Sequence, residues 1–266
     1  MHELIDIGAN LTHDSFDQDR AAVIERAQEQ GVTRMIVTGA TVDGSRDAIT
    51  MAEQHPGKLW ATTGVHPHHA AEYLPDGTDE LRKLAGSACV VAVGECGLDY
   101  FRNFSPREAQ LSAFAEQLGL AVETAKPVFL HQRDAHEDFL AVLGDFKDRL
   151  TGGVAHCFTG TTEQMQAYLD LGFYIGITGW ICDERRGMDL QSAVAHLPLD
   201  RVLLETDAPY LMPRDLPNKP DKRRNEPATL RHTLNTTAAL MNLDAEELAA
   251  AATKNTERLF GIGNSC

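Results

Sequence analysis

The feature that most constrains the fold is a repeated alternation of short apolar runs with longer amphipathic stretches. Eight runs have the length and the β-branched or apolar composition of buried strands. They are Leu4–Ile7, Met35–Val37, Leu59–Val65, Val90–Val93, Val128–His131, Val154–Phe158, Phe173–Ile177 and Val202–Glu205. Strands separated by helical segments predict an α/β fold built around a parallel sheet.

The segments between these strands have helical spacing of their apolar residues. The clearest predicted helix is Glu108–Thr124, where apolar side chains recur at intervals of three and four. Ser105 and Pro106 predict its start, as an N-cap followed by proline at the first helical position. Further helices are predicted at Asp17–Gln30, Gly44–Gln54, Thr162–Leu171 and Thr229–Met241.

Eight strands with helical crossovers in 266 residues fit a (β/α)8 TIM barrel, and a doubly wound open sheet is the alternative. A dinucleotide-binding sheet would carry Gly-x-Gly-x-x-Gly after its first strand, and none follows Leu4–Ile7. The chain contains no Pro-, Ser- or Gly-rich linker. We therefore predict a single TIM-barrel domain over residues 1–266.

The charge balance limits the kinds of partner. The chain has 24 Lys and Arg against 39 Asp and Glu, a net charge of −15. This argues against a protein that coats nucleic acid, because basic side chains supply most of the non-specific affinity for phosphate. A nuclease is still compatible, since a local basic surface can dominate the field that a substrate meets.

Several absences set expectations for location and assembly. There is no apolar stretch of roughly 20 residues, which predicts no membrane association, and no signal-peptide pattern, which predicts a cytoplasmic protein. Five scattered cysteines without a Cys-x-x-Cys pair favour reduced thiols. No predicted helix face shows an obvious self-complementary apolar patch, so a monomer is expected.

Polar side chains follow almost every predicted strand. They are Asp6 and Asn10, Thr38, His66, Glu95 and Asp99, His131 with Arg133 and Asp134, His156, Thr178, and Glu205 with Asp207. Each alone could be an ordinary core or surface residue, but a barrel brings the ends of its strands to one mouth. Carboxylates and imidazoles together predict a site for one or two divalent cations. Metal-assisted hydrolysis is the reaction class that follows.

Individual roles can be assigned within this set. Strand alternation places Glu205 and Asp207 on one face, and Asp207 is the predicted general base, with a strand-ending or helix-capping role as the alternative. His66 ends an apolar strand and is predicted to belong to the site, whereas His68 is predicted to be exposed in the loop that follows. Cys157 is predicted to point to the opposite strand face from His156, which argues against a cysteine nucleophile.

A basic segment follows Asp207. It contains Arg214, Lys219, Lys222, Arg223 and Arg224. It is either a solvated surface loop or a rim that contacts phosphate, and its position after the eighth strand favours the rim. Arg102 and the pair Arg185–Arg186 would reinforce it from other strand ends. Trp180 is positioned to stack on a base.

Together, several motifs resemble those of the TatD family of metal-dependent deoxyribonucleases. The motifs are Gly64–His68, Gly94–Asp99, Pro127–His131, His156–Gly160 and Glu205–Tyr210. The resemblance extends from Asp6 to Phe260. Three further segments are similar to the bacterial branch of the family: Gly176–Trp180, Asp183–Gly187 and Arg223–Pro227.

The resemblance implies an amidohydrolase-like TIM barrel and a 3′–5′ exonuclease acting on single-stranded DNA and RNA. It also implies dependence on Mg²⁺, with Mn²⁺ or another divalent cation as alternatives, and a link to DNA repair or degradation. Glu95, His131 and His156 would be metal ligands, Asp207 a further ligand or the base, and His66 a contact to the substrate phosphate. The predicted substrate contacts are His66, Arg133, Arg185, Arg223 and Arg224.

One departure concerns the first strand. Much of the wider family has Asp-x-His-x-His there, whereas this chain has Gly8 and Asn10 at the two histidine positions. This favours a labile hard cation over a tightly held second metal. Two other readings stay open: an amidohydrolase acting on a small lactone, amide or phosphotriester, and a barrel without enzymatic activity that binds nucleic acid or a protein.

Overall fold

A computed structural model describes residues 2–73, 75–217, 219 and 223–263. Its eight strands form one sheet in the order of the chain, β1 to β8. They are β1 (Leu4–Ala9), β2 (Val32–Val37), β3 (Leu59–Thr63), β4 (Val90–Asp99), β5 (Val128–Arg133), β6 (Gly153–Ala155), β7 (Tyr174–Ile177) and β8 (Val202–Leu204). All eight predicted strands are present, with ends that differ by up to six residues. The largest difference is in β4, which was predicted to end at Val93 but continues to Asp99, so Glu95 lies within the strand and not after it.

The first strand also bonds to the segment that follows the last. The N–H of Asp207 donates to the carbonyl of Gly8 at 2.8 Å, and the N–H of Asn10 donates to Ala208 at 2.8 Å. Sequential strand order with β1 beside β8 is the topology of a (β/α)8 barrel. A doubly wound sheet would have strands out of chain order. The predicted fold class is therefore confirmed and the open-sheet alternative is wrong.

Helices occupy the segments between the strands. They are α1 (Arg20–Glu29), α2 (Val42–Gln54), α3 (Pro75–Ala85), α4 (Arg107–Thr124), α5 (His136–Gly144), α6 (Thr162–Asp170), α7 (Met188–Val194), α8 (Leu230–Met241) and α9 (Ala245–Phe260). Sequence analysis named five of these and did not delimit α3, α5, α7 and α9. Among the described helices, none is long and apolar enough to cross a membrane.

The predicted start of α4 is wrong by one position. Pro106 is the N-cap residue and the helix begins at Arg107. The Ser105 hydroxyl is used elsewhere: it donates to the carbonyl of His68 at 2.8 Å and accepts from the N–H of Ala71 at 3.0 Å. Ser105 thus fixes the segment that follows β3 instead of capping the helix.

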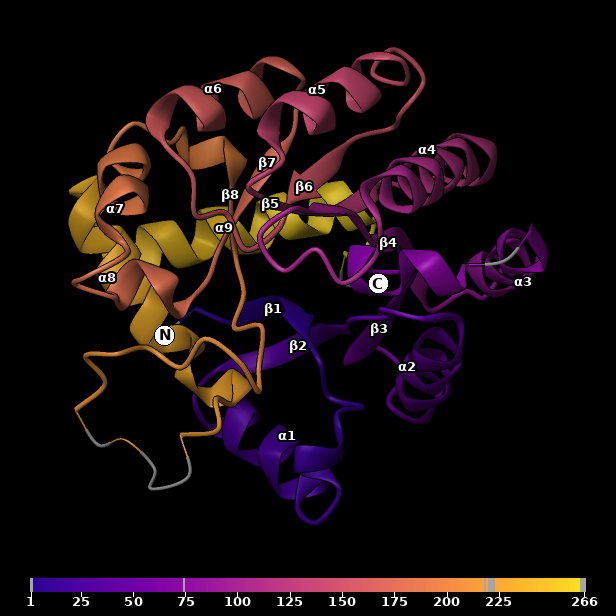
Figure 1. Ribbon diagram of the computed structural model, residues 1–266. Coiled ribbons are helices and arrows are strands. Elements are labelled where there is room, and N and C mark those ends of the chain that lie inside the picture. The colour runs from indigo at the N-terminus through magenta and orange to yellow at the C-terminus, as the bar shows by residue number, and fades with distance from the viewer. Residues whose placement is uncertain (1, 74, 218, 220–222, 264–266) are drawn as a thin grey trace. The chain divides into compact units, whose positions relative to one another are not determined.

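The described chain contains two compact units. One comprises residues 37–156 and 259–261, and the other comprises the remaining residues. In the first unit, α2, α3 and α4 lie outside β3 and β4; in the second, α6, α7 and α8 lie outside β7 and β8 (Figure 1). Strand β4 has all ten residues buried, because helices cover its outer face.

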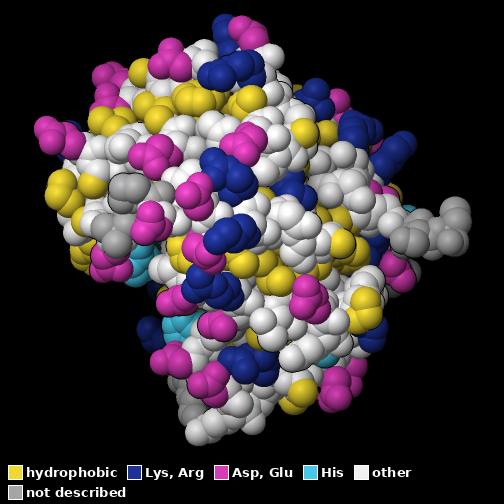
Figure 2. Space-filling view, turned by 90° about the vertical axis from the view of Figure 1, so that its right-hand side faces the viewer, with side chains coloured by type: hydrophobic (Ala, Val, Ile, Leu, Met, Phe, Trp, Pro, Cys, Tyr) yellow, Lys and Arg dark blue, Asp and Glu magenta, His cyan; other side chains and the backbone are white. Residues whose placement is uncertain are grey.

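At least one face of the protein is not uniformly acidic. On the face shown in Figure 2, Lys and Arg are interspersed with Asp and Glu. Ion pairs also join the outer helices of the first unit: Arg46 lies 2.7 Å from Glu80, and Arg82 lies 2.7 Å from Glu123. Exposed pairs of this kind contribute little to stability, so they affect solubility more than stability.

Candidate metal centre

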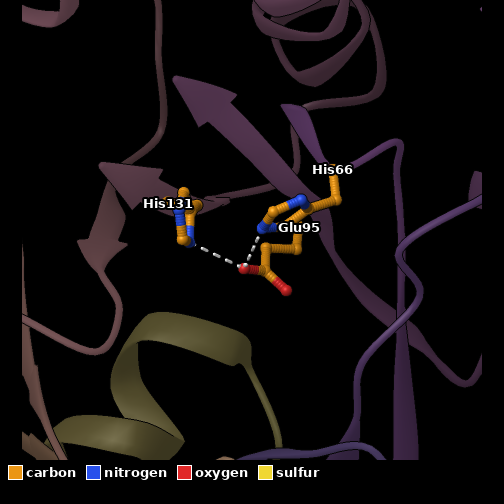
Figure 3. Close-up of side chains that lie close together, drawn as sticks. All are labelled: His66, Glu95 and His131. Carbon is orange, nitrogen blue, oxygen red and sulfur yellow. Dashed lines mark ion pairs between the residues drawn. The ribbon is translucent and has the colours of Figure 1, made fainter. Parts of the chain in front are cut away.

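Glu95 lies at the centre of a cluster of imidazoles. It lies on β4 and is buried. Its Oε1 atom is 3.3 Å from Nε2 of His66, 3.1 Å from Nδ1 of His131 and 2.9 Å from Nε2 of His156. Figure 3 shows two of these contacts, with His66 and His131 approaching the same carboxylate oxygen. Strands β4 and β5 and the segments after β3 and β6 therefore bring together one carboxylate and three histidines, a convergence that the sequence predicted.

The cluster favours an ionised Glu95. Burial alone disfavours the charged carboxylate, but electrostatic attraction to the facing His66 and His156 imidazoles and the hydrogen bonds from His131 and His156 outweigh it. They hold the pKa of Glu95 well below its ordinary value. The carboxylate is consequently an anionic ligand throughout the neutral range.

Asp99, at the end of the same strand, holds the outer nitrogen of His131. Its Oδ2 atom is 3.2 Å from His131 Nε2 and 2.8 Å from His68 Nε2, and its Oδ1 accepts from the N–H of Arg102 at 2.7 Å. Burial opposes ionisation, but these hydrogen bonds lower the pKa of Asp99. A carboxylate behind a metal-binding histidine fixes the ring orientation and raises its basicity.

His66 makes a different contribution from the other two histidines. Its Nδ1 accepts a hydrogen bond from the N–H of His68 at 3.1 Å, so in the neutral ring the proton lies on Nε2. Burial lowers the pKa of His66 to about 4, which keeps the ring neutral at pH 7. The Nε2–H of the neutral ring therefore donates toward Glu95 in this tautomer.

Two glycines make the close approach of β4 and β5 feasible. Gly94 and Gly97 have φ of 139° and 143°, in a region that favours glycine. A Cβ on Gly97 would lie 1.9 Å from the carbonyl oxygen of His131, and one on Gly94 would lie 2.1 Å from that of Phe129. The glycines that flank Glu95 thus allow its strand to lie directly against the backbone of His131.

Two buried glutamines of α4 fix the backbone around the cluster. Gln117 accepts from the N–H of Val65 at 2.7 Å and donates to its carbonyl at 3.0 Å. Gln110 does the same for Asp99, accepting at 2.8 Å and donating at 3.2 Å. Because Val65 immediately precedes His66, these amides position two members of the site.

Replacing Gln117 with Leu is expected to destabilise the protein. The change leaves the buried N–H and C=O of Val65 without partners, and each unsatisfied group costs about 1–3 kcal/mol. Gln166→Leu, on the exposed face of α6, is the matched control and should change stability by no more than about 0.5 kcal/mol. Urea unfolding of the two variants gives the comparison, and equal stabilities would contradict the role assigned to Gln117.

The donor set of the cluster fits a divalent cation. His66, Glu95 and His131 each offer a ligand atom, all within 4.8 Å of one another, and His156 adds a fourth candidate ligand atom, its Nε2, at 2.9 Å from Glu95 Oε1. The family resemblance implies Glu95, His131 and His156 as the ligands within this cluster, and that assignment stays a prediction. Carboxylate with imidazole suits transition metals and also accepts harder ions.

Asp207 lies in the second unit, beyond the end of β8. The strand stops at Leu204, and Asp207 has a φ of 55°, so strand alternation does not extend to it. The reasoning that placed Glu205 and Asp207 on one strand face is therefore wrong. Oδ1 of Asp207 accepts from the side-chain amide of Asn10 at 2.9 Å, which gives Asn10 a positioning role. The roles of Asp207 as base or ligand stay predictions.

Glu205 and Cys157 are joined by a hydrogen bond from the N–H of Cys157 to a Glu205 carboxylate oxygen. Cys157 follows β6 with a φ of 47° and is not a strand residue. The prediction that alternation turns its side chain to the opposite face of a strand is therefore wrong. Glu205 instead fixes the backbone turn next to His156.

The buried carboxylate of Asp6, on β1, makes stability depend on pH. Burial raises its pKa to about 7, against hydrogen bonds from Thr206 and Gly8 that lower it. Between about pH 4 and pH 7, Asp6 is protonated in the folded protein but ionised in the unfolded chain. The contribution of Asp6 to the free energy of unfolding is therefore complete below about pH 4 and is lost as the pH rises to about 7. We expect the melting temperature of the native protein to fall relative to that of Asp6→Asn over this range, and Asp47→Asn, exposed on α2, to behave like the native protein. Parallel pH dependences for all three would contradict this.

The basic residues have mixed environments. Arg224 lies 2.7 Å from Asp19 and from Glu226, Arg185 lies 3.5 Å from Asp183, and Arg223 is exposed. Lys222 lies outside the described residues. Asp19 and Glu226 raise the pKa of Arg224 above its ordinary value, so much of its charge is already compensated. Phosphate contact by Arg133, Arg185, Arg223 and Arg224 stays a prediction.

Three residues of the site region are not predicted from the sequence: His68, Phe101 and Phe104. His68, which was predicted to be exposed, instead contacts Asp99, so that prediction is wrong. Phe104 and Phe101 are 67% and 59% exposed in the segment after β4, although both are large and apolar. The ring of Phe104 lies 4.7 Å from that of His68 in an edge-on arrangement. Two exposed aromatic residues in one short loop were the available signal.

Comparison with known proteins identifies the class to which this fold and donor set belong. The family model for TatD related DNase matches residues 5–261. The chain belongs to the TatD family, as the motifs predicted. A relative from Erwinia tasmaniensis, named "3'-5' ssDNA/RNA exonuclease TatD", is 50% identical over 259 residues, which cover 97% of this chain and all of the relative.

Solved structures agree with the fold. YjjV, a TatD homologue from Escherichia coli K12, is 31% identical with a TM-score of 0.90, and 98% of each chain is covered. A TatD family hydrolase from Entamoeba histolytica is 28% identical with a TM-score of 0.89, over 98% of this chain and 99% of the other. An organophosphorus hydrolase from Deinococcus radiodurans is 16% identical with a TM-score of 0.59, over 98% of this chain and 91% of the other, and that likeness concerns the fold alone.

Proposed function

We propose that the protein is a metal-dependent 3′–5′ exonuclease that hydrolyses single-stranded DNA and RNA. The convergence of Glu95, His131 and His156 on one point carries the proposal, and the activity in the name of the relative from Erwinia tasmaniensis supports it. We further propose Mg²⁺ as the ion, a monomer acting in the cytoplasm, and a role in DNA repair or degradation.

Glu95, His131 and His156 would hold the cation. When bound, a divalent cation lowers the pKa of a water molecule and offsets charge on a phosphoryl group. Asp99 keeps the His131 ring in place through its outer nitrogen. His66 donates its Nε2–H to a non-bridging phosphate oxygen, where it stabilises the charge that develops. Asp207, oriented by Asn10, accepts the proton of the attacking water.

Phe101 and Phe104 would bind the bases of the strand. The guanidinium of Arg133 lies 5.0 Å from the centre of the Phe101 ring, and that of Arg102 lies 5.7 Å from it. Arg133 is thereby held beside an exposed aromatic surface, the combination that single-strand-binding proteins use for stacking and for phosphate. Stacking is tolerant of sequence, as an exonuclease requires.

Truncation of Phe104 is expected to weaken binding of the strand without stopping hydrolysis. Loss of one stacking partner costs about 1–3 kcal/mol, so KM for an oligonucleotide should rise by roughly 5- to 150-fold while kcat falls much less. Phe146→Ala, in the segment before β6, is the matched control. If kcat falls and KM does not change in Phe104→Ala, the ring acts on the chemistry and the stacking role is wrong.

The experiment that tests the proposed function compares single-stranded oligonucleotides labelled at the 3′ or the 5′ end. Purified protein is incubated with Mg²⁺, with Mn²⁺ and with EDTA, beside a Glu95→Ala, His156→Ala double variant. We expect a metal-dependent ladder that shortens from the 3′ end and is absent in the double variant. No cleavage with either ion would overturn the nuclease proposal and direct the search to small esters, lactones and amides.

A further inference from the structure

A second cluster of side chains that could ligate a metal is made of residues other than those assigned to the metal centre. It is formed by Cys182, Asp215 and His232, whose candidate ligand atoms all lie within 4.8 Å of one another. Cys182 ends the short 3-10 helix η3 (Gly179–Cys182), His232 lies on α8, and Asp215 lies in the segment after β8. Three elements distant in sequence thus present sulfur, nitrogen and oxygen at one place.

The contacts within the cluster show how it is built. Asp215 Oδ1 lies 2.6 Å from Nε2 of His232, and the buried thiol of Cys182 donates to the hydroxyl of Thr236 at 3.4 Å. Burial and the Asp215 carboxylate raise the pKa of Cys182 to about 12. The thiol is therefore neutral without a metal, and it would lose its proton only to a bound cation whose charge offsets that of the thiolate and of the Asp215 carboxylate.

The backbone around the cluster is closely packed. A Cβ on Gly179 would lie 2.3 Å from the carbonyl oxygen of Leu211, so η3 lies directly against the segment that carries Asp215. Arg214 adds an ion pair to Glu184 at 3.1 Å. The two segments are therefore held at a spacing that keeps the three ligand atoms together.

We propose that Cys182, Asp215 and His232 form a second cation site, selective for a zinc-class ion over Mg²⁺. Thiolate, imidazole and carboxylate are the donors that Zn²⁺ takes in proteins, with a fourth position open to water, whereas Mg²⁺ avoids sulfur. On binding, the S–H bond of Cys182 breaks, its proton leaves to solvent, and the sulfur forms the bond to the ion. The ion ties the segment after β8 to η3 and α8.

Cobalt is the probe that separates this site from the one at Glu95. Of the two donor sets only this one contains sulfur, so only this one gives a thiolate-to-cobalt charge-transfer absorption in the near ultraviolet. Full-length protein is titrated with Co²⁺ alone and then with Zn²⁺, which should displace Co²⁺ and remove the band. Cys182→Ser should abolish the band, and His232→Ala should weaken Co²⁺ binding by at least about tenfold.

Two further variants make the result specific. Cys157→Ser, beside the Glu95 centre, should keep the band. Zn²⁺ should raise the melting temperature of the single variant Glu95→Gln but not that of the double variant Glu95→Gln, Cys182→Ser. This comparison of melting temperatures does not depend on nuclease activity. No thiolate band at one equivalent of Co²⁺, or a band that persists in Cys182→Ser, would overturn the proposal and leave a hydrogen-bonded trio without a metal. Matching melting temperatures of native protein and Cys182→Ser without metal would exclude misfolding as the cause.

Discussion

Replacement of Glu95 by Gln is expected to abolish exonuclease activity while the fold is retained. The substitution keeps the shape of the side chain but removes the anionic oxygen on which three histidines converge. A bound metal contributes several kcal/mol of transition-state stabilisation, and each factor of ten in rate corresponds to about 1.4 kcal/mol. The loss should therefore reach roughly 10³-fold or more. Initial rates on an end-labelled oligonucleotide measure it.

The matched control for this prediction is Glu123→Gln. Glu123 lies on α4, where it pairs with Arg82, and its exchange should leave activity within about twofold because exposed pairs are weak. Thermal shift with Mn²⁺ supplies a second readout, since the ion stabilises only the form that binds it. Glu95→Gln should lose the shift. Retained activity together with a retained shift would show that the cation binds elsewhere.

The part of the site that sequence predicted depends on parallel strand order. His131 and Glu95 lie on the neighbouring strands β5 and β4, and strands in chain order bring such residues together whatever the loops do. The close approach of Glu95 to His131 is also indicated locally in the sequence, by Gly94 and Gly97 on either side of Glu95 and Cys96. A Cβ at either glycine would collide with the backbone of β5. Convergence of the ligands therefore follows from topology and backbone packing.

The predictions that failed depend on local geometry just past a strand end. His68 was assigned to solvent, but His66 caps the 3-10 helix η2 (Pro67–Glu72) that starts at Pro67, and this turn brings His68 to Asp99. Asp207 was placed by strand alternation, but its left-handed φ breaks the period of two. Such turns depend on contacts between residues that are distant in sequence, as when the Asn10 amide donates to Asp207. The spacing of residues along the chain does not reveal these contacts.

Helices were missed where packing, and not periodicity, determines them. Helix α7 has only seven residues, too short to show a repeated apolar face. Helix α5 has nine and follows directly on the polar residues that end β5. Short helices gain most of their stability from tertiary contacts, so the sequence of such a segment indicates a crossover between strands without fixing its ends.

Asp207→Asn is expected to reduce hydrolysis by about 10²- to 10⁴-fold, the contribution of a general base. The asparagine keeps the volume of the side chain and an oxygen that can accept from Asn10, so the melting temperature should change little. A base acts on the chemical step, so kcat should fall while KM stays near its native value. Steady-state rates and thermal melts of the same preparations test both statements.

Asn10→Ala separates orientation from chemistry at the same position. It removes the amide that donates to Asp207 Oδ1 at 2.9 Å but leaves the carboxylate able to take a proton. The loss of kcat in Asn10→Ala should be smaller than that in Asp207→Asn. When Asn10→Ala is added to Asp207→Asn, it should cause no further loss, because a positioning residue has no effect once the group that it positions is inactive. If the two losses multiply, Asn10 acts independently of Asp207. If Asp207→Asn keeps full activity, another group takes the proton, and the base must be sought among the remaining strand ends.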